Sequence, residues 1–276
     1  MRARKTSFEH RLKEFRQQSY WPGKVKSLEA ALRFVNQRGF VFFWPIQGCE
    51  LPSLWVAAAG WREVPSNHDD PGHITWGWKD RMLGQRKWYY AKVLRKKGTM
   101  ISLEAAPFFY RLSENYGSPE EDYLTQYQEG RLSPEAKAIY ETLLSEGPLY
   151  TQELRRRAKL SDKLYRFAKG LDELQADFKV LPAAVVEAGR WNYAYVYDLT
   201  HRHFPQLAEK AKIVDDLEAR RKILDFYFRS VGAATPQEIH RLFGWERTDL
   251  EEALEQPIAQ GSLLRTAEKL IVRQLG

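Results

Sequence analysis

The sequence predicts a mainly helical α+β fold made of tandem winged-helix units, each a helix-turn-helix followed by a β-hairpin, and we expect three of them. Three helical patterns and a hairpin pattern follow one another in the middle of the chain, and this order returns after Asp215 at a spacing of roughly 70 residues. The 276 residues also exceed the usual length of one domain. The expected parts are a basic N-terminal helix at 1–26, winged-helix units at 27–117, 131–205 and 213–276, and a linker at 118–130.

The N-terminal helix is predicted to begin at Thr6, because Thr6 and Glu9 have the spacing of a capping box. Ser27 is the expected N-cap of a second helix, with apolar residues on one face and Gly39 at its end. The apolar run at 40–46 should be buried whatever its conformation. A short helix at 51–60 and a polar loop at 64–73 follow.

The remainder of the first unit is a predicted basic hairpin, with two short strands around Lys96, Lys97 and Gly98. A helix at 104–113 comes next. The acidic, turn-rich stretch after it is expected to be a linker.

The second unit has the clearest pattern. Ser133 should start its first helix, Gly147 should end it, and Thr151 should cap the second helix. A third helix is expected after Asp162, and two strand-like runs joined at Gly189 complete the unit. In the third unit, a helix at 218–232, a second opened by Thr235 and Pro236, and a third at 247–261 precede two short strands.

The charge of the chain favours a nucleic-acid partner. Its formal charge is +7 with a pI near 9.3. Residues 1–26 carry eight basic residues against two Glu, and residues 79–97 carry eight against one Asp. Clustered cations interleaved with aromatics are typical of proteins that bind a phosphate backbone, although a solvated basic face is the alternative. We therefore expect DNA, in double-stranded form, as the partner.

The second and third helices of a winged helix form its DNA-reading element, and the wing touches the flanking backbone. In the second unit these helices carry a dense set of basic residues, whereas the last helix of the third unit is acidic and should repel phosphates. The predicted DNA-binding residues are Arg155, Arg156, Arg157, Lys159, Lys163, Arg166 and Lys169, together with Arg86, Lys87, Arg95, Lys96 and Lys97 of the first unit.

Metal and cofactor sites are not expected. His201 and His203 alternate as metal ligands on a strand can, but no carboxylate or Cys with supporting spacing accompanies them. His68, Asp69, Asp70 and His73 form a second cluster, which a solvated turn explains better than an active-site loop does. The chain also lacks a phosphate-binding glycine loop, a nucleophile elbow and an HExxH motif. These patterns favour binding over catalysis.

The predicted compartment is the cytoplasm. Cys49 is the single cysteine, which excludes an intramolecular disulfide, and a reducing environment fits it best. No apolar run approaches the length of a membrane span, so no membrane association is expected.

The segment YDLTHR at 197–202, with Pro205 soon after it, resembles the end of the second winged helix in the AlkZ/YcaQ-like family. Members of this family are bacterial DNA glycosylases that excise alkylated bases and unhook interstrand crosslinks. Trp191 after an Ala-Gly-Arg turn, and the segments at 77–94 and 108–112, agree with the same family. The resemblance implies three tandem winged helices around a DNA-binding channel.

The chain departs from this family at the catalytic signature, a Gln-x-Gln or Gln-x-Asp whose side chains activate the hydrolytic water. Phe42, Phe43 and Trp44 occupy the matching positions, and none of these side chains can accept a proton. The family also continues into a β-rich domain that this sequence does not include. The resemblance therefore implies a DNA-binding relative that lacks base-excision chemistry.

Two other functions remain open. A glycosylase with a displaced catalytic group would use Gln37, Gln47, Glu50 or Asp80, and an extruded base could stack on Trp76, Trp78 or Trp88. A protein-interaction scaffold would instead associate with a protein partner in a salt-insensitive way. Burial of residues 42–44 in the core would favour the non-catalytic DNA binder.

Overall fold

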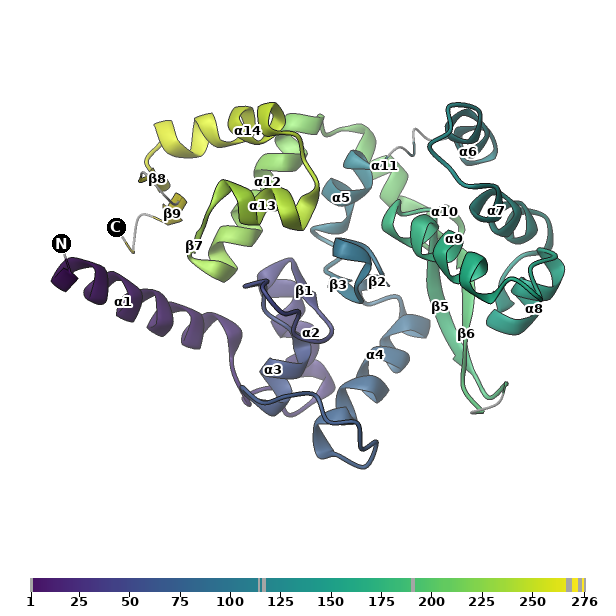
Figure 1. Cartoon of the computed structure of the whole chain (residues 1–276), viewed down its shortest axis with the longest axis horizontal. Helices are drawn as coiled ribbons and strands as arrows, with labels where there is room; N and C mark the ends of the chain where they lie inside the picture. Colours follow the sequence, from purple (N-terminus) through teal and green to yellow (C-terminus); the bar gives the residue numbers. More distant parts are fainter. Residues whose placement is uncertain are drawn as a thin grey trace.

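A computed structural model describes the backbone of residues 2–113, 115, 118–189, 192–266, 270–272 and 275, and the fold is mainly helical with small antiparallel sheets. Figure 1 shows three groups of elements side by side, with the first at the bottom centre, the second on the right and the third at the upper left. Among the described residues, no helix is both long and apolar enough to cross a membrane.

The same order of elements occurs three times: helix, strand, helix, helix, strand, strand. In the first unit these elements are α2 (Leu28–Arg38), β1 (Phe40–Phe42), α3 (Leu54–Ala59), α4 (Ile74–Gln85), β2 (Tyr89–Ala91) and β3 (Thr99–Ile101). In the second they are α7 (Pro134–Glu146), β4 (Leu149–Tyr150), α8 (Thr151–Arg157), α9 (Leu164–Ala176), β5 (Val180–Val186) and β6 (Ala194–Leu199). In the third they are α12 (Asp216–Val231), β7 (Ala233–Ala234), α13 (Pro236–Phe243), α14 (Arg247–Ala259), β8 (Leu263–Arg265) and β9 (Leu270–Val272).

The three sheets also share one topology. Each has three antiparallel strands, and the last strand of the unit lies between the first and the second, in the orders β1-β3-β2, β4-β6-β5 and β7-β9-β8. The first strand is therefore an edge strand that follows the first helix, and the other two form a hairpin. The predicted hairpins of the first and second units are confirmed, with η2 (Leu94–Lys96) inside the turn of the first.

The remaining elements connect and brace these units. They are α1 (Arg2–Tyr20), η1 (Pro71–His73), α5 (Ala106–Leu112), α6 (Pro119–Gln128), α10 (Thr200–His203) and α11 (Gln206–Lys212). The expected linker at 118–130 contains α6, whose Tyr123 and Gln126 are buried and which packs on α7. Tyr123 belongs to the apolar core of the second unit, so this segment is bound to that unit and is not a free linker.

The predicted helix caps are largely confirmed. Ser27 and Ser133 accept hydrogen bonds from the backbone of α2 and α7, and Thr235 forms a capping box with Glu238 at α13. Two details are corrected. Helix α1 begins at Arg2, so Thr6 lies within it. The Thr151 hydroxyl donates to the carbonyl oxygen of Tyr195 instead of capping α8, because β4 holds the chain against β6 at that point.

One apolar core runs through all three units. Phe40 of the first unit, Phe178 of the second and Phe226 of the third belong to the same cluster of buried side chains. Within the predicted apolar run, Phe42 and Phe43 are buried but Trp44 is 37% exposed. The expectation for residues 42–44 is therefore correct for the two phenylalanines and wrong for Trp44, which lies beyond the end of β1.

Candidate nucleic-acid interface

The exposed start of α9 concentrates cations. Lys163 is the N-cap residue of this helix, with Arg166 and Lys169 in its first two turns and Lys159 in the preceding turn, and all four are exposed. Over the part of the chain that the structure describes, Lys159, Lys163 and Lys169 form no ion pair, and Arg166 contacts Glu135 at 3.3 Å. No side chain caps the first turn, so its backbone N–H groups add to the positive end of the helix.

The neighbouring arginines of α8 are less free. Arg156 and Arg157 each form a 2.6 Å ion pair with Glu153, and Arg157 also contacts Glu146. These hydrogen bonds hold the pKa of the Glu153 carboxyl at about 2. Arg155 is half-buried. An anionic ligand would therefore compete with carboxylates for Arg156 and Arg157, but not for the lysines near α9.

The basic hairpin of the first unit is built into the junction between units. Arg86, Lys87, Arg95, Lys96 and Lys97 are all exposed, as expected of DNA contacts. The turn, however, packs through η2 against α9 and α13, and it lines a cavity of about 560 Å³. Asp177, Glu246 and Asp249 line the same cavity. The hairpin turn therefore does not project freely from the fold, and the nearby carboxylates would repel phosphates.

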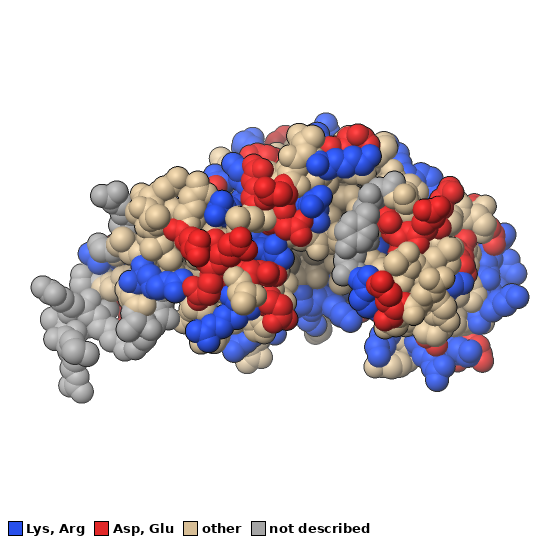
Figure 2. Space-filling view, turned by 90° about the horizontal axis from the view of Figure 1, so that it is seen from above, with Lys and Arg blue, Asp and Glu red and all other residues tan. Residues whose placement is uncertain are grey.

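The face seen from above is electrostatically mixed. Figure 2 shows Asp and Glu in several patches on it, with Lys and Arg between them. Helix α14, at the top of Figure 1, carries Asp249 and Glu251, which pair with Arg220 and Arg265. The acidic character expected of the last helix is present, and part of it is neutralised within the third unit.

The three tryptophans proposed to stack on bases lie in different environments. Trp78 and Trp88 are buried in the core of the first unit, which removes them from any surface that a base can reach. Trp76 is half-buried and stacks on His73 with ring centroids 4.8 Å apart. Its ring also lies 5.9 Å from the ring of Trp44, so Trp76 and Trp44 share one aromatic surface.

The catalytic candidates do not converge. Gln37 is exposed and accepts a hydrogen bond from Arg38, Gln47 is exposed beyond β1, and Glu50 forms a 2.8 Å ion pair with Arg16 of α1. Asp80 lies elsewhere, on α4. Phe42, which the family resemblance matches to the first position of the catalytic signature, is fully buried.

Lys79, next to Asp80, is buried, although the sequence predicted a cationic surface at this position. It was counted with an exposed basic block, but its side chain is 2% exposed and its Nζ atom lies 2.6 Å from Asp80. Nζ donates hydrogen bonds to the hydroxyls of Tyr193 and Tyr195 and lies over the ring of Tyr195. Burial lowers the pKa of Lys79, and Asp80 opposes that shift.

This arrangement, which we call the Lys79 cage, consists of Lys79, Asp80, Tyr90, Tyr193 and Tyr195. Two of its tyrosines come from β6 and its approach, and the other members come from α4 and β2. In Figure 1 the β5–β6 hairpin lies beside α4. The cage therefore fixes the second unit's hairpin on the first unit. A lysine followed much later by two alternating tyrosines is too weak a pattern to have predicted it.

The two histidine clusters lie on or around short helices, one on α10 and the other around η1. His201 and His203 lie on the short helix α10, and burial lowers the pKa of both imidazoles. Asp70 forms a bidentate contact with Arg62 and caps η1. Within the described residues, no group of three or more His, Cys, Asp or Glu is arranged to hold a metal ion.

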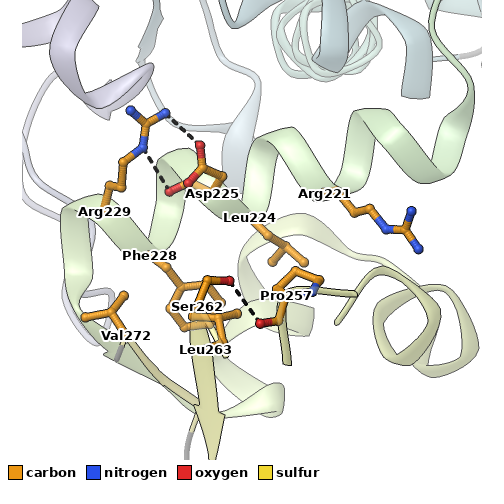
Figure 3. Close-up of a pocket in the computed structure, with 9 residues that line it drawn as sticks. All are labelled: Arg221, Leu224, Asp225, Phe228, Arg229, Pro257, Ser262, Leu263 and Val272. Atoms are coloured by element: carbon orange, nitrogen blue, oxygen red, sulfur yellow. Dashed lines mark hydrogen bonds and ion pairs between the residues drawn. The ribbon is translucent and has the colours of Figure 1, made fainter. Parts of the chain in front are cut away.

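A pocket of about 500 Å³ lies in the third unit, between α12, α14 and the last two strands. Figure 3 shows its apolar floor, which includes Leu224, Phe228 and Leu263, and the ion pair of Arg229 with Asp225 at one side. None of the predicted catalytic or DNA-binding side chains lines this pocket. Trp191, part of the family resemblance, lies outside the described residues.

The fold defines a mainly helical α+β protein with three repeated helix-and-hairpin units. The family model described as "AlkZ related" matches residues 25–244, and the chain belongs to this family. Its structure is similar to that of the Streptomyces sahachiroi DNA glycosylase AlkZ, with a TM-score of 0.58 and 14% sequence identity, over 95% of this chain and 69% of that chain. This likeness shows a shared AlkZ-like fold. No curated protein sequence matches the chain.

Proposed function

We propose that the chain is a winged-helix protein that binds double-stranded DNA and lacks the base-excision chemistry of its glycosylase relatives. The threefold repeat supports the winged-helix assignment, because each unit has three helices and an edge strand that pairs with the last strand of a hairpin. In such units the third helix carries the DNA-reading residues, particularly at its N-terminal end.

The observation that carries the binding proposal is the exposed, unpaired set of lysines at the start of α9, the third helix of the second unit. Over the described part of the chain, Lys159, Lys163 and Lys169 have no carboxylate partner. Phosphate groups can therefore bind them without displacing an existing ion pair. The uncapped helix N-terminus favours an anion at the same place.

The proposed lack of excision chemistry rests on the residues at the positions that the family resemblance matches to the catalytic signature. Phe42 is buried in the core and offers no hydrogen-bonding group, and Trp44 offers only an indole ring. Activation of a water molecule needs a group that can accept its proton or orient it. Gln37 and Gln47 have suitable chemistry but lie apart from those positions.

The DNA-binding proposal is tested by a salt titration of duplex affinity. Each phosphate contact contributes about 0.9 to the slope of log K against log salt concentration, so K159Q/K163Q/K169Q should flatten the slope by about 2–3. The matched variant R155A/R156A/R157A should change it less, because two of its arginines are already paired. An unchanged slope in the lysine variant would contradict this binding face.

A DNA glycosylase with a displaced catalytic group is the second candidate, and one observation favours it. Asp80 follows Trp76 by four residues on α4, which places both on one face of the helix. Trp44 extends the same aromatic surface. Asp80 could then act on a base that stacks on these rings. Release of alkylated purines by the wild type and its loss in Asp80→Asn would support this candidate over the non-catalytic binder.

A further inference from the structure

The first turn of α9 exposes two large apolar side chains that the fold does not use. Leu164 is 61% exposed and Tyr165 is 79% exposed, whereas Phe167 on the other side of the helix is buried in the core of the second unit. Apolar side chains stabilise a protein when they are removed from water. Leu164 and Tyr165 remain in water, and as two adjacent large apolar side chains they mark the tip of α9 as a candidate contact surface.

The surroundings of this pair are cationic. Lys163 precedes it, Arg166 follows it, and Lys159 and Lys169 lie exposed in the adjoining turns. The carboxylates nearby are Asp162, in the turn before the helix, and Glu135, which already contacts Arg166. An apolar tip ringed by cations complements a ligand that has flat apolar surfaces between anionic groups. A base stack between two phosphate backbones has this chemistry.

We propose that Leu164 and Tyr165 enter the DNA base stack at a position where stacking is already weak, such as a missing or mispaired base. The inference rests on the DNA-binding function proposed above and specifies which DNA is bound. Apolar side chains that enter a stack must separate the bases, and the cost is smallest where a base is absent or mispaired. The surrounding lysines hold the phosphates, and Tyr165 provides a ring on which the neighbouring base can stack.

The inference predicts that the protein binds a duplex with an abasic site more tightly than an intact duplex. An intact duplex has no open step, so only the cations should contribute to its binding. A duplex with a stable abasic analogue should gain the contacts of Leu164 and Tyr165 as well. Because a base stacked on an aromatic ring typically changes affinity by about tenfold, we expect about that preference for the abasic duplex.

The test compares the affinities of the full chain for an intact duplex and for the same duplex with a tetrahydrofuran abasic analogue. The L164A/Y165A variant should bind the intact duplex with unchanged affinity and salt slope but lose the preference for the abasic duplex. Ile213→Ala is the matched control, since Ile213 is 85% exposed and follows α11, outside α8 and α9. This control should retain the preference.

Two results would overturn the inference and leave DNA binding itself intact. One is equal affinity of the wild type for both duplexes, and the other is a preference that survives in L164A/Y165A. Failure of the wild type to bind either duplex in a salt-dependent way would instead overturn the proposed function together with this inference. All altered side chains are exposed, so loss of folding should not obscure the comparison.

Discussion

The Nζ atom of Lys79 lies 3.0 Å from the hydroxyl oxygen of Tyr193, and this contact joins α4 of the first unit to the hairpin of the second. Tyr193 in turn donates a hydrogen bond to Asp80, so the ammonium and the carboxylate share one partner. This cage, together with the continuous apolar core, holds the second unit in place. The cage therefore helps to set the position of the second unit, which includes α9, relative to the first.

Lys79→Met should destabilise the protein. The substitution removes the ammonium group that donates hydrogen bonds to the hydroxyls of Tyr193 and Tyr195, and it leaves Asp80 without its cation. We therefore expect the free energy of unfolding to fall by about 1–3 kcal/mol. Thermal or urea unfolding measures this. Lys92→Met is the control, because Lys92 joins the same two units through an exposed ion pair with Asp172 and should cost at most about 1 kcal/mol. Equal effects would argue against a special role for the cage.

Gly170→Ala should loosen the packing between α9 and α7. A Cβ atom at Gly170 would lie 2.9 Å from the backbone nitrogen of Ala136, and backbone cannot move aside easily. We expect a loss of about 1–3 kcal/mol in unfolding free energy. Gly84→Ala on α4 is the matched control, since a Cβ there meets no atom within 4 Å and should stabilise the helix by about 0.5–1 kcal/mol. An unchanged free energy of unfolding in Gly170→Ala would mean that α9 and α7 are further apart than in this structure.

Asp70→Asn should lower stability in a pH-dependent way. Arg62 holds the pKa of the Asp70 carboxyl at about 2, below its ordinary value of 3.8, so the folded state binds this proton less readily than the unfolded state. The stabilisation is complete above pH 4 and is lost as the pH falls towards 2. The difference in Tm between wild type and Asp70→Asn should therefore be largest above pH 4 and shrink towards pH 2. A difference that is constant with pH would exclude the Arg62 pair as its cause.

Phe42→Gln, which places a Gln at a position that the family resemblance matches to the catalytic signature, should destabilise the protein. Phe42 is fully buried, so the substitution loses apolar contacts and places a carboxamide in the core, at a cost of about 3 kcal/mol or more. Trp44→Gln, at the exposed second position, should cost about 1 kcal/mol or less. Calorimetry of the two variants gives the comparison. A well-tolerated Phe42→Gln would show that position 42 can reach solvent, and it would favour a functional site there.

Local patterns in the sequence were enough to predict much of the fold. The caps at Ser27, Ser133 and Thr235 were identifiable because their hydrogen bonds involve residues only three positions away. The Lys79 cage was not predictable, because Lys79 and Tyr193 are far apart in sequence and meet only when two units pack together. A lysine in a basic block is also exposed in most proteins.

The candidate DNA-binding residues also depend on contacts between distant parts of the sequence. The sequence identified the basic residues around α8 and α9 but could not distinguish Arg157, which is paired with Glu146, from Lys163, which is unpaired among the described residues. It also could not show that Trp78 and Trp88 are core residues while Trp44 is exposed. Burial and ion pairing depend on tertiary contacts, and these decide which side chains remain available to a ligand.

The central claim is that the protein binds DNA without excising bases, and one paired measurement tests it most directly. A single-turnover excision assay on duplexes with alkylated purines is run beside a binding titration on the same DNA at two salt concentrations. The account predicts binding that weakens steeply with salt, and no base release above the rate without protein. Base release above that rate would contradict it and assign the chain to the enzymes of its family.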